Sequence, residues 1–387
     1  MYSGTHHTNQ YRFIMKKVTL LVGLAAALGC NSAEAVDWNW KGDIRYRYES
    51  QFKDTDSKND EHSRDRHRLR VRLGVYPWIT EELSAGVQLS TGGNETTSRN
   101  ETFDDLFIAD DIWLNEAFID YHPMFLDGQV NVLLGKRDVA KTLIMTKDLV
   151  WDSDITLEGA TLQYGKDADG KEKDGINAVV GYYAMNEVNT STDEQDAYLF
   201  AGQLAYKGEI NDFGFSLGTG YYDLVNLDYK NTGSTYKPAF DYVGKDFNIL
   251  EFFGSFGGPI TETIPWKIYG QYAHNTASHD SGHIERYKID NDKRDAYLVG
   301  LQIGNAKNPG QWSVSGEYVR IEKDAVTVLS DSDRNGGSGT DLEGFKVGAT
   351  YHLVQNMMLG ATYYNFTQMD KDDPTNHLFQ ADVVVKF

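Results

Sequence analysis

The sequence has one cysteine, Cys30, and it lies in an N-terminal segment with the layout of a cleavable export signal. Met15-Lys16-Lys17 is basic, Val18 to Leu28 is a short apolar run, and Ala33-Glu34-Ala35 is an A-x-A cleavage site. Cys30 also partly fits a lipid-attachment motif, but Ala27 stands where that motif prefers leucine. If cleavage follows Ala35, the mature chain has no cysteine, which excludes disulfides, c-type haem attachment, thiolate metal sites and cysteine nucleophiles.

Long apolar runs are also missing, because no stretch approaches the roughly 18 residues of a transmembrane helix. The mean hydropathy is −0.51, and 57 acidic against 37 basic residues give a formal net charge of −20. These values suit a soluble protein, but a transmembrane β-barrel exposes only alternate residues to lipid and has equally low hydropathy. The seven prolines fall in or beside polar connections, where a missing backbone N–H breaks no strand ladder.

The C-terminal segment from Leu378 to Phe387 alternates strictly between two kinds of side chain. One face carries Phe379, Ala381, Val383, Val385 and Phe387, and the other carries Gln380, Asp382 and Lys386. An apolar outer face, a polar inner face and a terminal phenylalanine are typical of the last strand of a bacterial outer-membrane β-barrel.

The same period of two recurs along the chain and predicts strands throughout. We expect sixteen strands, near residues 38–50, 64–76, 82–91, 112–122, 128–137, 158–165, 175–186, 197–207, 213–223, 247–257, 266–275, 295–304, 311–321, 341–353, 356–369 and 377–387. Connections after even strands are short, as at Lys207–Asp212, and those after odd strands are long and acidic, as at Leu224–Asp246. Short periplasmic turns and longer extracellular loops give this alternation.

We therefore predict an all-β fold, a transmembrane antiparallel β-barrel of sixteen strands over residues 36–387. An upstream extension (1–14) and the signal peptide (15–35) precede it. The aromatic content of 13%, with 24 tyrosines, suits aromatic girdles at two membrane interfaces. A soluble β-sandwich would also bury one face of each strand, but it would not combine an export signal, a terminal phenylalanine and alternating connection lengths.

An arginine ladder is the strongest local pattern, and we define it as Arg45 and Arg47 in the first predicted strand with Arg66, Arg68, Arg70 and Arg72 in the second. Each set lies opposite apolar residues that should face lipid. Because an arginine at the lipid midplane costs roughly 2–4 kcal/mol, we expect all six in the lumen. They then form a basic wall that sets a transverse field in a pore, an internal salt-bridge network with Asp43, Glu49 and Glu116 that stiffens the wall, or both together.

The third long connection, Asp138 to Leu157, is unusually apolar for a solvent loop. Its large apolar residues are Leu143, Ile144, Met145, Leu149, Val150, Trp151 and Ile155. We expect it to fold into the barrel and to place Asp148, Asp152 and Asp154, helped by Glu116, opposite the arginine ladder. Arg137, just before it, should face the lumen. A surface loop in a trimer interface is the alternative.

Other motifs are weak. His279 and His283 are four residues apart but fall in a connection, and acidic runs such as Asp370 to Asp373 are usually solvated loop tips. No Gly-x-Ser-x-Gly, paired-histidine metal helix, phosphate loop or basic nucleic-acid patch is present. We therefore predict no catalytic residue, no cofactor, no metal site and no nucleic-acid partner.

The mature chain resembles a Gram-negative outer-membrane porin, close to the sixteen-stranded general porins and the family described as "putative porins". The resemblance rests on architecture and the C-terminal strand. It implies outer-membrane localisation, contact with lipid and lipopolysaccharide, a homotrimer, and passive diffusion of small hydrophilic solutes and ions through a pore narrowed by the third loop. Two alternatives remain open, an anion- or substrate-selective channel and a plugged adhesive or enzymatic barrel.

Overall fold

The computed structural model describes residues 36–53, 63–93, 95–187, 196–227, 247–277, 293–334, 339–369 and 375–387. The predicted upstream extension, the signal peptide, His279, His283 and the acidic run 370–373 lie outside these residues. Within the described ranges, no helix combines the length and the apolar character needed to cross a bilayer.

The described residues form seventeen strands, of which sixteen are long. They are β1 (Asp37–Lys53), β2 (Ser63–Thr80), β3 (Leu83–Ser90), β4 (Glu101–Thr102), β5 (Trp113–Tyr121), β6 (Val130–Asp138), β7 (Thr156–Tyr164), β8 (Gly175–Asn186), β9 (Ala197–Ile210), β10 (Phe213–Val225), β11 (Phe247–Thr261), β12 (Ile264–Asn275), β13 (Asp295–Gly304), β14 (Trp312–Ile321), β15 (Leu342–Val354), β16 (Met357–Gln368) and β17 (Asn376–Lys386). Three short helices accompany them: η1 (Phe125–Gly128), α2 (Val139–Thr142) and η4 (Ser332–Arg334).

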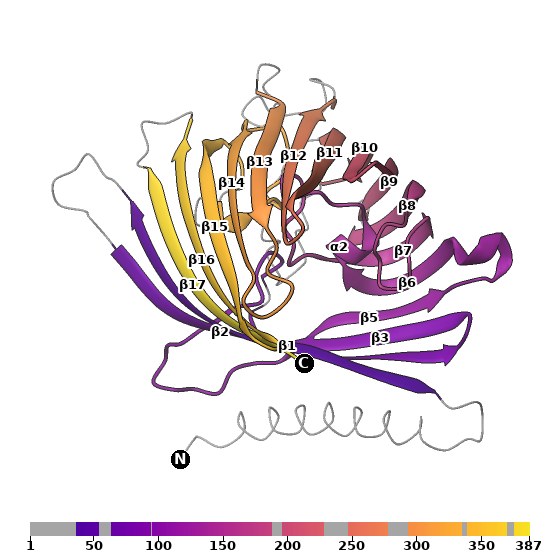
Figure 1. The fold of residues 1–387 in the computed structure, drawn as a ribbon, viewed down its shortest axis with the longest axis horizontal. Helices are drawn as coiled ribbons and strands as arrows, with labels where there is room; N and C mark the ends of the chain where they lie inside the picture. The colour runs from indigo at the N-terminus through magenta and orange to yellow at the C-terminus, as the bar shows by residue number, and fades with distance from the viewer. Residues whose placement is uncertain are drawn as a thin grey trace, which may run out of the picture. The chain divides into compact units, whose positions relative to one another are not determined.

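The long strands form one closed antiparallel barrel (Figure 1). Each pairs with its neighbours in sequence, and β1 closes the sheet by pairing with both β2 and β17. In the β1–β17 register Tyr46 lies opposite Val383 and Arg47 opposite Asp382. The predicted sixteen-stranded barrel is therefore confirmed. The extra strand, β4, has two residues and folds back from the second long connection onto β2.

The outer face of the barrel is apolar, and many polar side chains are buried on its inner face, the reverse of a soluble domain. On β3, Ser84 and Gln88 are buried, while Leu83 and Val87, on the other face, are partly exposed. The same rule leaves Phe379 of β17 and the terminal Phe387 exposed and Gln380 of β17 buried. Because polar side chains are buried where apolar ones are exposed, the soluble β-sandwich is wrong.

Strands extend further at the short turns than the sequence predicts. The expected turn Lys207–Asp212 contracts to two residues because β9 runs to Ile210, and Asn211 supplies the left-handed backbone with φ of 55°. β2 likewise continues through the expected turn at Pro77 to Thr80, with an irregular register near Trp78. A proline near a strand end is tolerated because only one ladder bond is lost.

A hydrophobic cluster also fills part of the lumen. It joins the third connection to inward-facing residues of the later strands, such as Tyr222 of β10 and Phe253 of β11. The clustered residues come from β7 to β17, from the third connection and from the seventh long connection, residues 322–340. The inner faces of β1 and β2 carry charged side chains instead, and they form the functional site.

Candidate functional site

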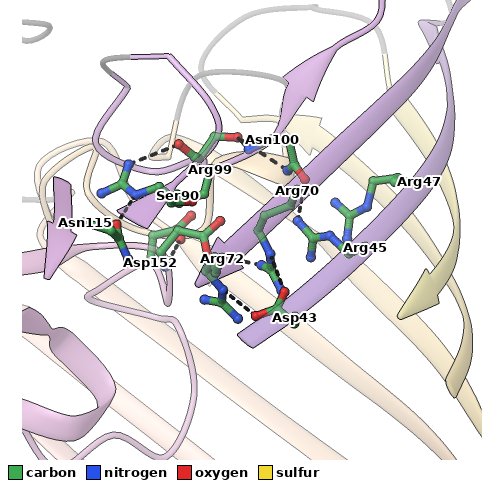
Figure 2. Close-up of polar contacts among 12 residues, drawn as sticks. Asp43, Arg45, Arg47, Arg70, Arg72, Ser90, Arg99, Asn100, Asn115 and Asp152 are labelled. Atoms are coloured by element: carbon green, nitrogen blue, oxygen red, sulfur yellow. Dashed lines mark hydrogen bonds and ion pairs between the residues drawn. The ribbon is translucent and has the colours of Figure 1, made fainter. Parts of the chain in front are cut away.

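The arginine ladder lies on the inner faces of β1 and β2, and most of it is paired with carboxylates. Asp43 accepts hydrogen bonds from Arg70 Nη2 at 2.9 Å and from Arg72 Nε at 2.6 Å (Figure 2). Glu49, on the same strand as Asp43, pairs with Arg66 and lies 3.6 Å from Arg68 Nη1. The predicted salt-bridge network with Asp43 and Glu49 is therefore present.

Arg47 is paired across the closing seam of the barrel. Its Nε and Nη2 donate to the two carboxylate oxygens of Asp382 on β17, at 2.7 and 2.9 Å. This two-pronged geometry holds a guanidinium in a fixed orientation. Arg45 differs, because its Nη2 donates to the neutral side chain of Asn100, at 2.5 Å, in the second long connection.

The second long connection also folds toward the ladder. Arg99 Nε donates to Asn115 Oδ1 of β5 at 2.5 Å (Figure 2). Arg99 Nη1 donates to the Glu95 carbonyl oxygen. Ser98 Oγ accepts a bond from Arg68 Nη2 at 3.4 Å. These contacts tie the connection to the inner wall on both sides.

The third connection packs against the inner wall of the barrel opposite the ladder. It begins at α2, where the Asp138 side chain accepts a bond from Ala140 N. Ile144 exchanges two backbone hydrogen bonds with the Gln203 amide of β9, at 2.8 and 2.9 Å. Trp151 is buried and meets the Tyr222 ring edge-on with centroids 5.2 Å apart. The large apolar residues of the third connection thus lie in the hydrophobic cluster that fills part of the lumen.

The seventh long connection, Glu322 to Thr340, packs against the third. Ala325, Val326 and Leu329 are buried in the same cluster, and Asp152 N donates to the Leu329 carbonyl oxygen at 2.6 Å. Sequence reasoning missed this segment. The signal was present, since this connection is as apolar near residue 326 as the third connection is near residue 150.

Asp148 of the third connection lies among cations. Lys346 Nζ of β15 is 3.7 Å and Arg334 Nη2 of η4 is 3.9 Å from its carboxylate. Burial alone would raise the pKa of Asp148, but these cations outweigh it and hold that pKa well below its usual range. Asp148 therefore stays ionised, and its ion pairs link the third connection to Arg334 in the seventh connection and to Lys346 in the wall.

Asp152 has the opposite electrostatic character. Its carboxylate accepts bonds from the backbone N–H groups of Asp154, at 2.8 Å, and Ser332, at 3.3 Å. Burial and the neighbouring Asp331 carboxylate raise the pKa of Asp152 to about 8. Burial also raises the pKa of Asp331, against the pull of Lys346 and Arg334. Because like charges at close range disfavour double ionisation, this pair holds a proton at neutral pH.

A cavity of about 150 Å³ separates the ladder from these carboxylates. Its charged lining consists of Arg45, Arg47, Arg70 and Lys346 with Asp148, Asp152, Asp154, Asp331 and Asp333. Asp154 lies 3.6 Å from Arg70 Nη1 and so links the third connection to the ladder. We call this space the charged cavity.

A second cavity, of about 360 Å³, is lined by Asp43, Arg72, Lys41, Lys141 and Arg137, among others. Arg137 donates to Asp120 at 3.1 Å. Arg66, Arg68 and Glu116 border neither cavity.

Glu116 is held on the wall by contacts that the sequence pattern does not show. It pairs with Lys141 of α2 at 3.2 Å and accepts a bond from the Tyr76 hydroxyl at 2.7 Å. None of these partners is a ladder arginine. Glu116 thus anchors the start of the third connection to the wall.

Comparison with known proteins identifies the chain. The sequence profile of a family described as "Putative porin" matches residues 31–240 and 225–387. The chain belongs to this porin family. No curated protein matches the porin.

Solved structures show the same fold at low identity. The high-pH structure of Pseudomonas putida OprB is 10% identical, with a TM-score of 0.57, over 90% of this porin and 94% of that chain. A triple mutant of Rhodopseudomonas blastica porin is 11% identical, with a TM-score of 0.51, over 91% of this porin and 100% of that chain. The family match and the shared fold together support an outer-membrane channel for passive diffusion.

Proposed function

We propose that small hydrophilic solutes and ions cross the porin through the charged cavity, between the arginine ladder and the carboxylates of the third connection. The observation that supports this is the cavity lining, with Arg45, Arg47 and Arg70 on one side and Asp148, Asp152 and Asp154 among the groups on the other. Opposed charges across a narrow passage orient polar solutes. They exclude apolar solutes, because an apolar solute would displace the water around these charges without replacing its hydrogen bonds.

The charge balance favours weak ion selectivity over strong anion selectivity. Four cationic and five acidic side chains line the charged cavity, and the Asp152–Asp331 pair holds one proton at neutral pH. The two signs nearly cancel, and salt screens what remains over about 8 Å at physiological ionic strength. A porin selective for anions would need an excess of unpaired cations along this path.

A single introduced cysteine tests the route. Ser153 is exposed and lines the charged cavity, so Ser153→Cys in the cysteine-free mature chain gives one thiol there. We expect a charged methanethiosulfonate reagent to reduce single-channel conductance within seconds. Leu106→Cys, at a fully accessible site away from the cavity, is the control and should conduct as before. Modification of Ser153→Cys without loss of conductance would refute this route.

The plugged-barrel alternative gives a different result in the same experiment. The third and seventh connections fill part of the lumen, so a barrel that they block completely would fold, accept the label and show no conductance steps. Steps that respond to the label favour the open channel.

We also propose that the porin forms homotrimers in contact with lipid and lipopolysaccharide, and that the segment 15–35 is removed as a signal peptide. The resemblance to general porins supports the first proposal, and the A-x-A site before Val36 supports the second. Chemical cross-linking of the native membrane, followed by gel electrophoresis, tests the trimer. A homotrimer should give bands up to three times the monomer mass and no higher. Mass measurement of the exported chain should give residues 36–387.

A further inference from the structure

Arg45 is the one member of the arginine ladder without an acidic partner among the described residues. The other five lie within ion-pair distance of Asp43, Glu49 or Asp382. In the described part of the chain, no carboxylate oxygen comes within 4.0 Å of the Arg45 guanidinium, and its recorded hydrogen bond goes to the neutral Asn100 side chain.

The barrel register explains this difference. β1 pairs with β17 so that Arg47 lies opposite Asp382, whereas Arg45 lies opposite Val384. Both β17 residues point inward, because side chains two apart share a face. Arg47 therefore lies across the seam from the Asp382 carboxylate, whereas Arg45 lies across from the isopropyl group of Val384.

The surroundings of Arg45 suit an anionic group. Thr97, Ser98 and Asn100 line the charged cavity beside it and carry neutral hydroxyl and amide groups. Two carboxylates of the cavity lining are paired with other ladder arginines, since Asp154 lies 3.6 Å from Arg70 and Asp333 lies 3.4 Å from Arg47. Arg45 thus lines the cavity without a carboxylate in direct contact among the described residues.

We propose that Arg45 is the centre of a subsite that binds the carboxylate of a small, singly charged hydrophilic solute during its passage. The inference rests on the proposed route through the charged cavity. The acidic residues that also line the cavity would repel a doubly charged anion, which favours a monocarboxylate over phosphate. The cavity volume of about 150 Å³ holds roughly five waters at about 30 Å³ each, enough for the carboxylate end of a small polar solute.

Interruption of the single-channel current by gluconate tests this subsite. Gluconate is a hydrophilic monocarboxylate, and glucitol, the matching polyol without the carboxylate, is the control solute. Single porin channels in planar bilayers should show brief current blocks with gluconate at concentrations where glucitol gives none. Phosphate at pH 8, a dianion, should block less than gluconate.

Two variants remove the subsite in different ways. Arg45→Gln deletes the cation, and Val384→Asp gives Arg45 the cross-seam partner that Arg47 already has. Each should raise the half-blocking concentration of gluconate about tenfold, the effect of losing one charge-assisted hydrogen bond. Lys53→Gln removes one positive charge from the exposed end of the same strand and should leave block unchanged.

The outcomes separate this inference from the proposed route. Channels that conduct but block equally with gluconate before and after Arg45→Gln would overturn the subsite and leave the route intact. Phosphate block at or above the gluconate level would overturn the assignment to monocarboxylates. A folded porin without conductance steps would overturn the proposed route itself. Arg45→Lys should restore part of the gluconate block, because the charge returns without the fork geometry.

Discussion

At the residue scale, the inner wall is organised by shared carboxylates. Asp43 serves both Arg70 and Arg72, and Glu49 serves both Arg66 and Arg68. Each acidic residue therefore cancels repulsion between two neighbouring arginines of the ladder. A wall of this kind is rigid, because moving one guanidinium leaves its neighbour uncompensated.

Asp43→Asn tests this sharing. We expect a loss of about 3 kcal/mol in the free energy of unfolding, because two arginines lose their buried partner. The released charges should also shift the reversal potential in a potassium chloride gradient toward that of chloride. Urea unfolding from lipid vesicles measures the first effect. Unchanged stability and selectivity would show that Asp43 contributes little.

The protonated Asp152 gives a pH dependence with a defined sign. The pKa of Asp152 is about 8 in the folded state and 3.8 in the unfolded chain. Between pH 3.8 and pH 8 the folded state therefore keeps this proton, and the unfolded state loses it. The stability from this group is therefore full at low pH and is lost as pH rises toward 8. Channel noise should grow from pH 6 to pH 9 as Asp152 and Asp331 repel each other. Asp152→Asn should remove this pH dependence. An equal rise in channel noise from pH 6 to pH 9 in the Asp152→Asn variant would contradict the account.

At the element scale, the third connection is held by a few apolar anchors. Trp151 is buried against Tyr222, while Asp148, Asp152 and Asp154 of the same connection line the charged cavity. Burial of one large aromatic side chain is worth several kcal/mol, so a single residue controls how firmly the segment is fixed.

Trp151→Ala should loosen the third connection without unfolding the barrel. We expect larger and noisier single-channel currents, because a cavity opens beneath the segment and its position fluctuates. Phe107→Ala is a matched control, since it also removes an aromatic ring but at a fully exposed site. Equal effects of the two substitutions would contradict an anchoring role for Trp151.

The sequence predicts elements well here and partners less well. Alternation fixes which residues share a face, so the inward direction of Arg70 and the outward direction of Leu73 are predictable before any fold is known. The pairing of Arg47 with Asp382 is not, because the two residues are 335 positions apart and meet only when the first and last strands close the barrel. Alternation also carries no information on which loops fold inward.

At the scale of the whole molecule, the barrel depends on the inverted burial pattern. Val347 lies mid-strand on the outer face of β15 and is exposed, whereas Ser315 of β14 lies on the inner face beside the charged residues. Val347→Lys should weaken folding into bilayers by about 2–4 kcal/mol, the cost of a charge near the midplane. Ser315→Lys should fold like the unmodified chain. Equal tolerance of both substitutions in vesicle refolding would contradict the membrane orientation.

The most direct test of the account is single-channel recording of the refolded porin in planar bilayers, with the reversal potential across a potassium chloride gradient. The account predicts stable conductance steps, with a reversal potential close to zero because the charges of the cavity lining nearly cancel. A folded barrel that gives no steps would contradict passage through the charged cavity, and a reversal potential near the chloride limit would contradict its charge balance.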